Sequence, residues 1–86
     1  MFYEVQVGAF GDPEKAAAVI DQLRDRYPAV YMAPRDGPLG RYYRVRMGPF
    51  RAPQELRQVA HALQREGHPH FVDEVPASAF WSQHLG

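Results

Sequence analysis

A short pattern occurs twice in this chain of 86 residues, as VQVGAF at residues 5–10 and as VRMGPF at residues 45–50. The offset of 40 residues also aligns positions on either side of the pattern, among them Tyr3 with Tyr43, Pro13 with Pro53 and Leu23 with Leu63. A period of this size indicates a repeated supersecondary unit, and with only two copies the units must pack against each other. We expect the shared glycine, Gly8 or Gly48, to let the chain turn sharply out of a strand.

Each copy has the pattern of a strand, a helix and a second strand. In the first copy, residues 2–10 alternate apolar and polar side chains, which is typical of a half-buried strand. Asp12 and Pro13 then suit a helix cap and a first helical residue. The apolar side chains that follow recur at the spacing of one helical face, and we expect this helix to span residues 12–27. A strand at 29–33 completes the unit.

The second copy repeats this order. After a stretch rich in turn residues at 34–40, alternation returns at residues 41–47. A helix is expected over residues 53–67, because its apolar stripe lies 40 positions beyond the first one and Gly67 suits a helix end. Residues 70–75 are expected to form the last strand, with a facing that the sequence leaves ambiguous. The predicted element order is therefore β-α-β-β-α-β.

This order predicts an α+β sandwich of the ferredoxin-like or RNP-like type, a four-stranded antiparallel sheet with two helices on one face. Each βαβ half is too small to bury its own apolar face, so two halves together close one core, and we expect a single domain over residues 1–76. We expect residues 77–86 to form a C-terminal tail. Phe80 and Trp81 in this tail either fold back over the core or reach a partner.

Composition argues against several classes of protein. Ten basic and ten acidic residues give a formal net charge of zero, which disfavours a duplex-binding protein that relies on phosphate neutralisation. There is no cysteine to form a disulfide or a thiolate metal site, and no apolar run approaches the roughly 20 residues of a membrane span. The histidines have no established ligand spacing, and no nucleophile or carboxylate pair falls on a common predicted surface. We therefore expect a protein that is not an enzyme and uses no cofactor or metal.

The sheet face opposite the helices is the candidate binding surface. Period-two alternation predicts that this face carries Glu4, Gln6, Gly8, Tyr31, Tyr42, Arg44 and Arg46. We expect the guanidinium groups of Arg44 and Arg46 to be exposed there. Aromatic rings beside guanidinium groups can bind ring-shaped ligands by stacking and charge-assisted hydrogen bonds. The same residues also suit a solvated sheet face, so the composition alone leaves both interpretations open.

Three stretches taken together resemble the SPOR domain, a sporulation-related repeat of bacterial cell-envelope proteins: YEVQVGAF, DPEKAAAVIDQL and YYRVRMGPF. The resemblance covers residues 2–75. It implies a peptidoglycan-binding module that recognises glycan strands lacking stem peptides and targets its parent protein to the division septum. It also implies an anchored or exported parent, and hence a periplasmic location in the cell envelope. Ala9 departs from the family pattern, because many members have serine there, and Ala52 replaces the usual helix cap.

The resemblance also implies site residues. By position, the sheet-face glutamine of the family corresponds to Gln6, and its arginine pair in the third strand corresponds to Arg44 and Arg46. The lactyl carboxylates of a peptide-free glycan suit the two guanidinium groups, while Tyr31 or Tyr42 can stack on a sugar face. The amide of Gln6 can donate to and accept from acetamido groups.

Two other classes share the predicted fold. RNA-recognition modules have the same element order and place aromatic residues on the central strands, but the chain lacks their Lys/Arg-Gly-Phe/Tyr-Gly/Ala-Phe pattern and has no net charge. A protein-interaction module on the same fold is the third class, because a fold alone does not determine function. We expect no binding of nucleic acid, no membrane contact by the domain itself, and a monomer.

Overall fold

The computed structural model describes residues 2–27 and 29–76 of the chain. They form the elements β1 (Phe2–Phe10), α1 (Pro13–Leu23), β2 (Val30–Gly37), β3 (Gly40–Phe50), α2 (Pro53–Arg65) and β4 (Phe71–Val75). The predicted tail, with Phe80 and Trp81, lies outside the described residues. Neither helix in the described part is long and apolar enough to cross a membrane.

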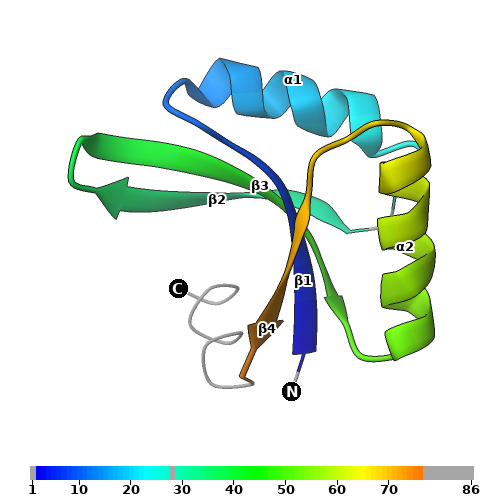
Figure 1. Ribbon diagram of the computed structural model, residues 1–86. Helices are drawn as coiled ribbons and strands as arrows, with labels where there is room; N and C mark the ends of the chain where they lie inside the picture. The colour runs from blue at the N-terminus through cyan, green and yellow to red at the C-terminus, as the bar shows by residue number, and fades with distance from the viewer. Residues whose placement is uncertain (1, 28, 77–86) are drawn as a thin grey trace.

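The strands form one antiparallel sheet in the order β2-β3-β1-β4. Both helices lie on the same face of this sheet (Figure 1), where Leu23 of α1 and Leu63 of α2 share one core with Val5 and Met47. The predicted fold class, element order and placement of the helices are therefore confirmed.

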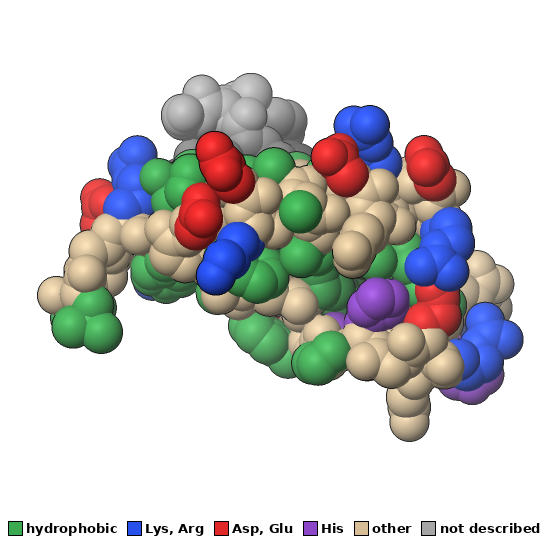
Figure 2. Space-filling model, turned by 90° about the horizontal axis from the view of Figure 1, so that it is seen from above, with side chains coloured by type: hydrophobic (Ala, Val, Ile, Leu, Met, Phe, Trp, Pro, Cys, Tyr) green, Lys and Arg blue, Asp and Glu red, His purple; other side chains and the backbone are tan. Residues whose placement is uncertain are grey.

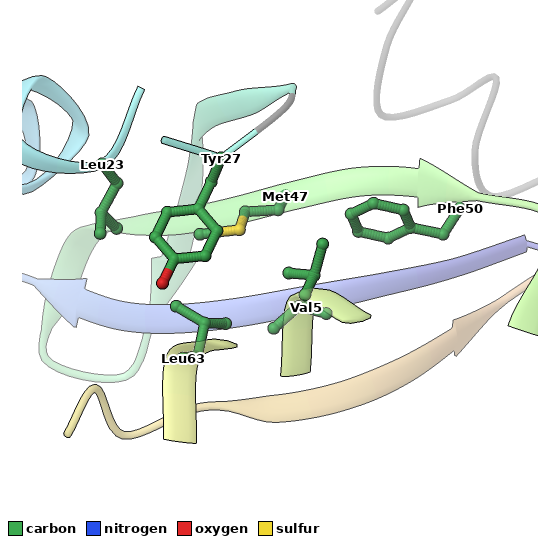
Figure 3. Close-up of a cluster of buried hydrophobic side chains, with 7 residues drawn as sticks. Val5, Leu23, Tyr27, Met47, Phe50 and Leu63 are labelled. Atoms are coloured by element: carbon green, nitrogen blue, oxygen red, sulfur yellow. The ribbon is translucent and has the colours of Figure 1, made fainter. Parts of the chain in front are cut away.

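The core draws side chains from both halves of the chain. Val5 and Met47 extend from the central strands toward the helices, where Leu63 and Tyr27 meet them (Figure 3), and Phe50 belongs to the same cluster. The side chains of Val5, Met47 and Leu63 are 0% exposed. Full burial of one such side chain contributes roughly 1.5–3 kcal/mol to stability, so a few residues account for much of what holds a domain of this size.

Both helices begin where the sequence predicts, but α1 is shorter than expected. The Oδ1 atom of Asp12 accepts a hydrogen bond of 2.9 Å from the Glu14 N–H, and Pro13 is the first helical residue. The predicted helix over 12–27 ends at Leu23, and the N–H groups of Arg26 and Tyr27 then both bond to the Leu23 carbonyl in the turn that follows. This turn brings Tyr27 into the core.

The α2 helix also ends earlier than its predicted range of 53–67. It ends at Arg65, and Gly67 follows with φ 75°, a left-handed conformation that suits glycine after a helix. Tyr27 joins this end of α2 to the end of α1, since its hydroxyl donates to Glu66 Oε2 at 2.7 Å.

The β2–β3 hairpin extends well beyond the predicted strands at 29–33 and 41–47. Its ladder continues to the pair formed by Gly37 and Gly40, which leaves a connection of two residues. The prediction of a turn over 34–40 is wrong because β2 is an edge strand, where Pro34 is tolerated without loss of a central ladder. Gly40 has φ 117°, which only glycine adopts readily.

The expectation that Gly8 and Gly48 end their strands is also wrong, since both strands continue for two further residues. Gly48 has φ 131°, and a Cβ there would lie 3.0 Å from the Tyr3 carbonyl oxygen and 3.2 Å from Glu4 Cγ. Glycine at this position therefore permits close approach of β3 to β1. A Cβ at Gly8 would instead lie 2.8 Å from the Phe10 ring.

We predict that Leu23→Ala and Leu63→Ala each lower the free energy of unfolding by roughly 2–4 kcal/mol, because each leaves a cavity in the single core. Leu39→Ala is the matched control, since Leu39 is fully exposed in the hairpin connection and its removal should change stability by less than about 0.5 kcal/mol. Urea denaturation followed by circular dichroism measures all three. Equal stability of the Leu63→Ala and Leu39→Ala variants would contradict the described core.

Candidate functional site

The face of the sheet opposite the helices, called the open face below, carries the candidate site. Directly opposite residues of antiparallel strands share a face. This gives three rows across the open face, from the middle of the sheet toward the β2–β3 connection: Tyr31, Arg46, Gln6 and Phe71; then Ala33, Arg44 and Ala9; then Arg35 and Tyr42. The structure thus brings all five predicted site residues onto one face.

Gly8 is an exception among the residues expected on the open face. The register between β1 and β3 shifts between Gln6 and Gly8, so that Gly8 lies opposite Val45. Val45 is 0% exposed and shares the helix side of the sheet with Met47. An irregularity of one residue inverts the facing of everything that follows it in the strand, which alternation alone does not reveal.

Arg46 is the centre of a polar cluster on the open face. Its Nε atom donates to Glu4 Oε2 at 3.1 Å, its Nη1 atom donates to Gln6 Oε1 at 3.1 Å, and its Nη2 atom donates to Asp73 Oδ2 at 3.0 Å. Nη2 also lies 3.1 Å from Glu4 Oε2. These contacts connect β3 to β1 and β4 through a single side chain.

The expectation that Arg46 is exposed is wrong, because its side chain is only 2% exposed and that of Glu4 is 0% exposed. A buried guanidinium is tolerated only when its charge and its N–H groups have partners, which Glu4, Gln6 and Asp73 supply. Burial by itself lowers the pKa of Arg46, but the hydrogen bond to Asp73 and the charge of Glu4 outweigh it and raise the pKa. Arg46 therefore stays charged and is engaged within the protein.

Tyr31 belongs to the same cluster. Its hydroxyl donates to Glu4 Oε1 at 2.5 Å. Burial is the main cause that raises the pKa of Tyr31, and the hydrogen bond to Glu4 raises it further because ionisation would place two negative charges side by side. The phenol is thus held neutral against the carboxylate of Glu4.

Arg44 and Tyr42 lie nearer the β2–β3 connection, outside this cluster. Arg44 is half-buried, and its Nε atom donates to the Ala33 carbonyl oxygen at 3.3 Å. Burial lowers the pKa of Arg44, as do the positive charges of Arg46 and Arg35. Within residues 2–27 and 29–76, no carboxylate lies within ion-pair distance of Arg44.

Three residues of the open face were missed by sequence reasoning as site residues. Asp73 and Phe71 were missed because the facing of the last strand was ambiguous, and only its pairing with Glu4 and Gln6 places them. Arg35 was missed because it falls in the stretch predicted as a turn. The signal for Arg35 was its period-two spacing from Tyr31, which continues through the turn-rich residues.

A shallow cleft of about 320 Å³ adjoins the site where β1 extends beyond the end of β4. It is lined by Gln6, Val7, Gly8, Ala9, Pro69, His70 and Phe71. The Phe71 side chain is 53% exposed beside Gln6, so an aromatic surface adjoins the amide. The part of the chain that the structure describes contains no group of three or more potential metal ligands close enough to hold an ion.

Comparison with known proteins identifies the class. The family model for the SPOR domain matches residues 2–73. The crystal structure of the RlpA SPOR domain from Pseudomonas aeruginosa is similar, with a TM-score of 0.76 and 22% sequence identity over 87% of this chain and 100% of that chain. A comparison with curated protein sequences gave no match. The chain belongs to the SPOR domain family, a family of peptidoglycan-binding modules, as its sequence motifs predicted.

We predict that Glu4→Gln lowers the free energy of unfolding by about 3 kcal/mol, because it leaves the buried charge of Arg46 with only Asp73 as an ionic partner. The double variant Glu4→Gln/Arg46→Met should regain part of this loss. Glu74→Gln is the matched control, since Glu74 is exposed on β4. This substitution should change the free energy of unfolding by less than about 0.5 kcal/mol. If the Glu4→Gln and Glu74→Gln variants unfolded at the same denaturant concentration, the result would contradict a stabilising role for the polar cluster around Arg46.

The tyrosines predict a pH dependence of stability. Burial, followed by the neighbouring Glu66 or Glu4, raises the pKa of Tyr27 and Tyr31 above the unfolded value of 10.0. The unfolded chain therefore loses these protons first, and the free energy of unfolding should fall as the pH rises above about 10. The Tyr31→Phe variant should show a smaller decrease in the free energy of unfolding with pH, and the double variant Tyr27→Phe/Tyr31→Phe should show a smaller decrease still. Denaturation curves from about pH 9 to about pH 11 measure the slope, and an unchanged slope in the double variant would refute the assignment.

Proposed function

We propose that this domain is a non-catalytic module that binds peptidoglycan through the open face and recognises glycan strands that lack stem peptides. The observation that carries the proposal is Arg44, a cation on the open face of a SPOR domain with no acidic partner within the described residues. Removal of a stem peptide leaves the lactyl carboxylate of each muramic acid free. A guanidinium can bind such a carboxylate through two parallel hydrogen bonds.

Of the remaining site residues, two contact the ligand in this proposal and two hold other side chains in place. Tyr42 is half-buried, two residues before Arg44 on the same face, and offers its ring to a sugar. Gln6 is half-buried with its amide oxygen bonded to Arg46, so its amide nitrogen is available to donate to an acetamido group. Arg46 and Tyr31 act as supports in this proposal, since Arg46 orients the Gln6 amide and Tyr31 holds Glu4.

The location of the domain follows from its ligand. Peptide-free glycan arises where amidases act on the wall, and a module that binds it brings its parent protein to the division septum. This role requires the periplasmic side of the cell envelope, in agreement with a family of cell-envelope proteins. The SPOR family is a binding family, so we assign any lytic activity to another domain of a parent protein. We infer that the domain acts as a monomer.

The proposal predicts that Arg44→Ala weakens binding to amidase-treated sacculi by about 1.5–3 kcal/mol through the loss of a charged hydrogen bond. Arg44→Lys should restore binding only in part, because lysine cannot form the bidentate pair. Arg57→Ala is the matched control, since it removes the same charge from the exposed surface of α2. Co-sedimentation with sacculi before and after amidase treatment measures binding.

Binding should also weaken with added salt, less steeply than for a protein that follows a phosphate backbone. If the Arg44→Ala and Arg57→Ala variants bound sacculi equally well, the binding site would have to lie elsewhere than on β3. Tighter binding to single-stranded RNA than to stripped glycan would favour the nucleic-acid alternative.

A further inference from the structure

The charges of the open face separate into a half in which the arginine is paired with carboxylates and a basic half. On the β1–β4 side, Arg46 is paired with two carboxylates, those of Glu4 and Asp73. Toward the β2–β3 connection, Arg35 and Arg44 have no carboxylate within ion-pair distance in the described part of the chain. The helix side differs, since acidic and basic side chains are interspersed on the face that Figure 2 shows.

The geometry brings Arg35 and Arg44 within reach of each other. Arg35 is opposite Tyr42 and Arg44 is opposite Ala33, so the two arginines are diagonal neighbours on adjacent strands. Such positions are roughly 7–8 Å apart, a separation that long side chains can bridge. The ring of Tyr42 adjoins both positions.

The nearest acidic residue along the chain does not neutralise this pair. Asp36 follows Arg35 directly, and successive residues of a strand point to opposite faces. Its Oδ1 atom instead lies 3.2 Å from Arg41 Nε, its cross-strand partner. The positive charge of Arg35 contributes to the lowered pKa of Arg44, so each cation acts on the other. Like charges at adjacent positions repel each other, and an anion bound between them would offset that repulsion.

We propose that Arg35 and Arg44 together form a two-cation subsite that takes a carboxylate of the ligand, whereas Arg46 makes no ligand contact. This inference rests on the proposed function and names the chemistry that the open face reads, a polysaccharide that carries carboxylates. The carboxylate-bearing side of the glycan lies over β2 and β3, and its acetamido and hydroxyl groups lie toward Gln6. Arg35 is exposed, so it can reach the ligand without a change in the fold.

The test pairs a change in the protein with a change in the ligand. Peptide-free glycan fragments from amidase-treated sacculi are used as they are, and also after reduction of their carboxylates to alcohols. Arg35→Ala should weaken binding of the native fragments about tenfold, as expected for one charged hydrogen bond. The same substitution should change binding of the reduced fragments less than twofold, because these fragments lack the carboxylate that Arg35 would bind. The comparison follows the logic of a double-mutant cycle. Circular dichroism and urea denaturation establish that the variant is folded.

Arg41→Ala is the matched control, because it removes an equal charge from the same hairpin at a position that faces away from the open face. It should bind both forms of glycan within about twofold of the unchanged protein, as expected for a rim charge without a direct contact. Two results would overturn the subsite: native binding by Arg35→Ala equal to that of Arg41→Ala, or an equal loss by Arg35→Ala on native and reduced fragments. If the unchanged protein bound native and reduced fragments equally strongly, the proposal that the domain binds glycan would stand. The proposal that the subsite binds a carboxylate would be rejected. Absence of binding to native fragments would reject the proposed function, and the subsite with it.

Discussion

The buried guanidinium of Arg46 constrains three of the four strands at once. Its nitrogens require acceptors from β1 and β4, and Glu4, Gln6 and Asp73 provide them. Because an unpartnered charge would be strongly unfavourable at a site that is 2% exposed, the strands have little freedom to shift in register. The open face is therefore held rigid by an internal ionic cluster, and the side chains that remain for a ligand are displayed on a surface that is already organised.

Periodicity predicted the architecture because it is a local property of the chain. Alternation and helical spacing indicated which residues face the helices, and the repeated glycine-phenylalanine pattern indicated a two-part core. The internal repeat with its offset of 40 residues stays a prediction. The burial of Arg46 could not be predicted in the same way. Alternation assigns a face, but whether a charge on that face is exposed depends on the acceptors that other strands bring to it. Asp73 is 27 residues away along the chain, and its facing was set only by pairing with β1.

The other differences from the sequence-based predictions also arise from pairing between strands. The residues from Pro34 to Gly37 have the composition of a turn, yet they extend β2 because β3 offers a continuous partner and no strand lies on the other side. Arg35 thereby becomes part of the sheet surface. The shift in register after Gln6 likewise moves Gly8 to the helix side and leaves Ala9 beside Arg44. These effects explain why alternation placed most of the candidate residues on the open face but did not predict the contacts that they make.

Gly48 connects the backbone to this arrangement. Its positive φ and the absence of a Cβ allow β3 to pass close to Tyr3 and to the base of the Glu4 side chain. Any larger residue there would crowd the Tyr3 carbonyl oxygen and the side chain of Glu4, which pairs with Arg46, although position 48 itself offers nothing to a ligand. Sequence variation at this glycine is consequently restricted by the electrostatics of the opposite strand. A survey of natural variants that scored only ligand-facing side chains would overlook one of the positions on which the integrity of the binding surface depends.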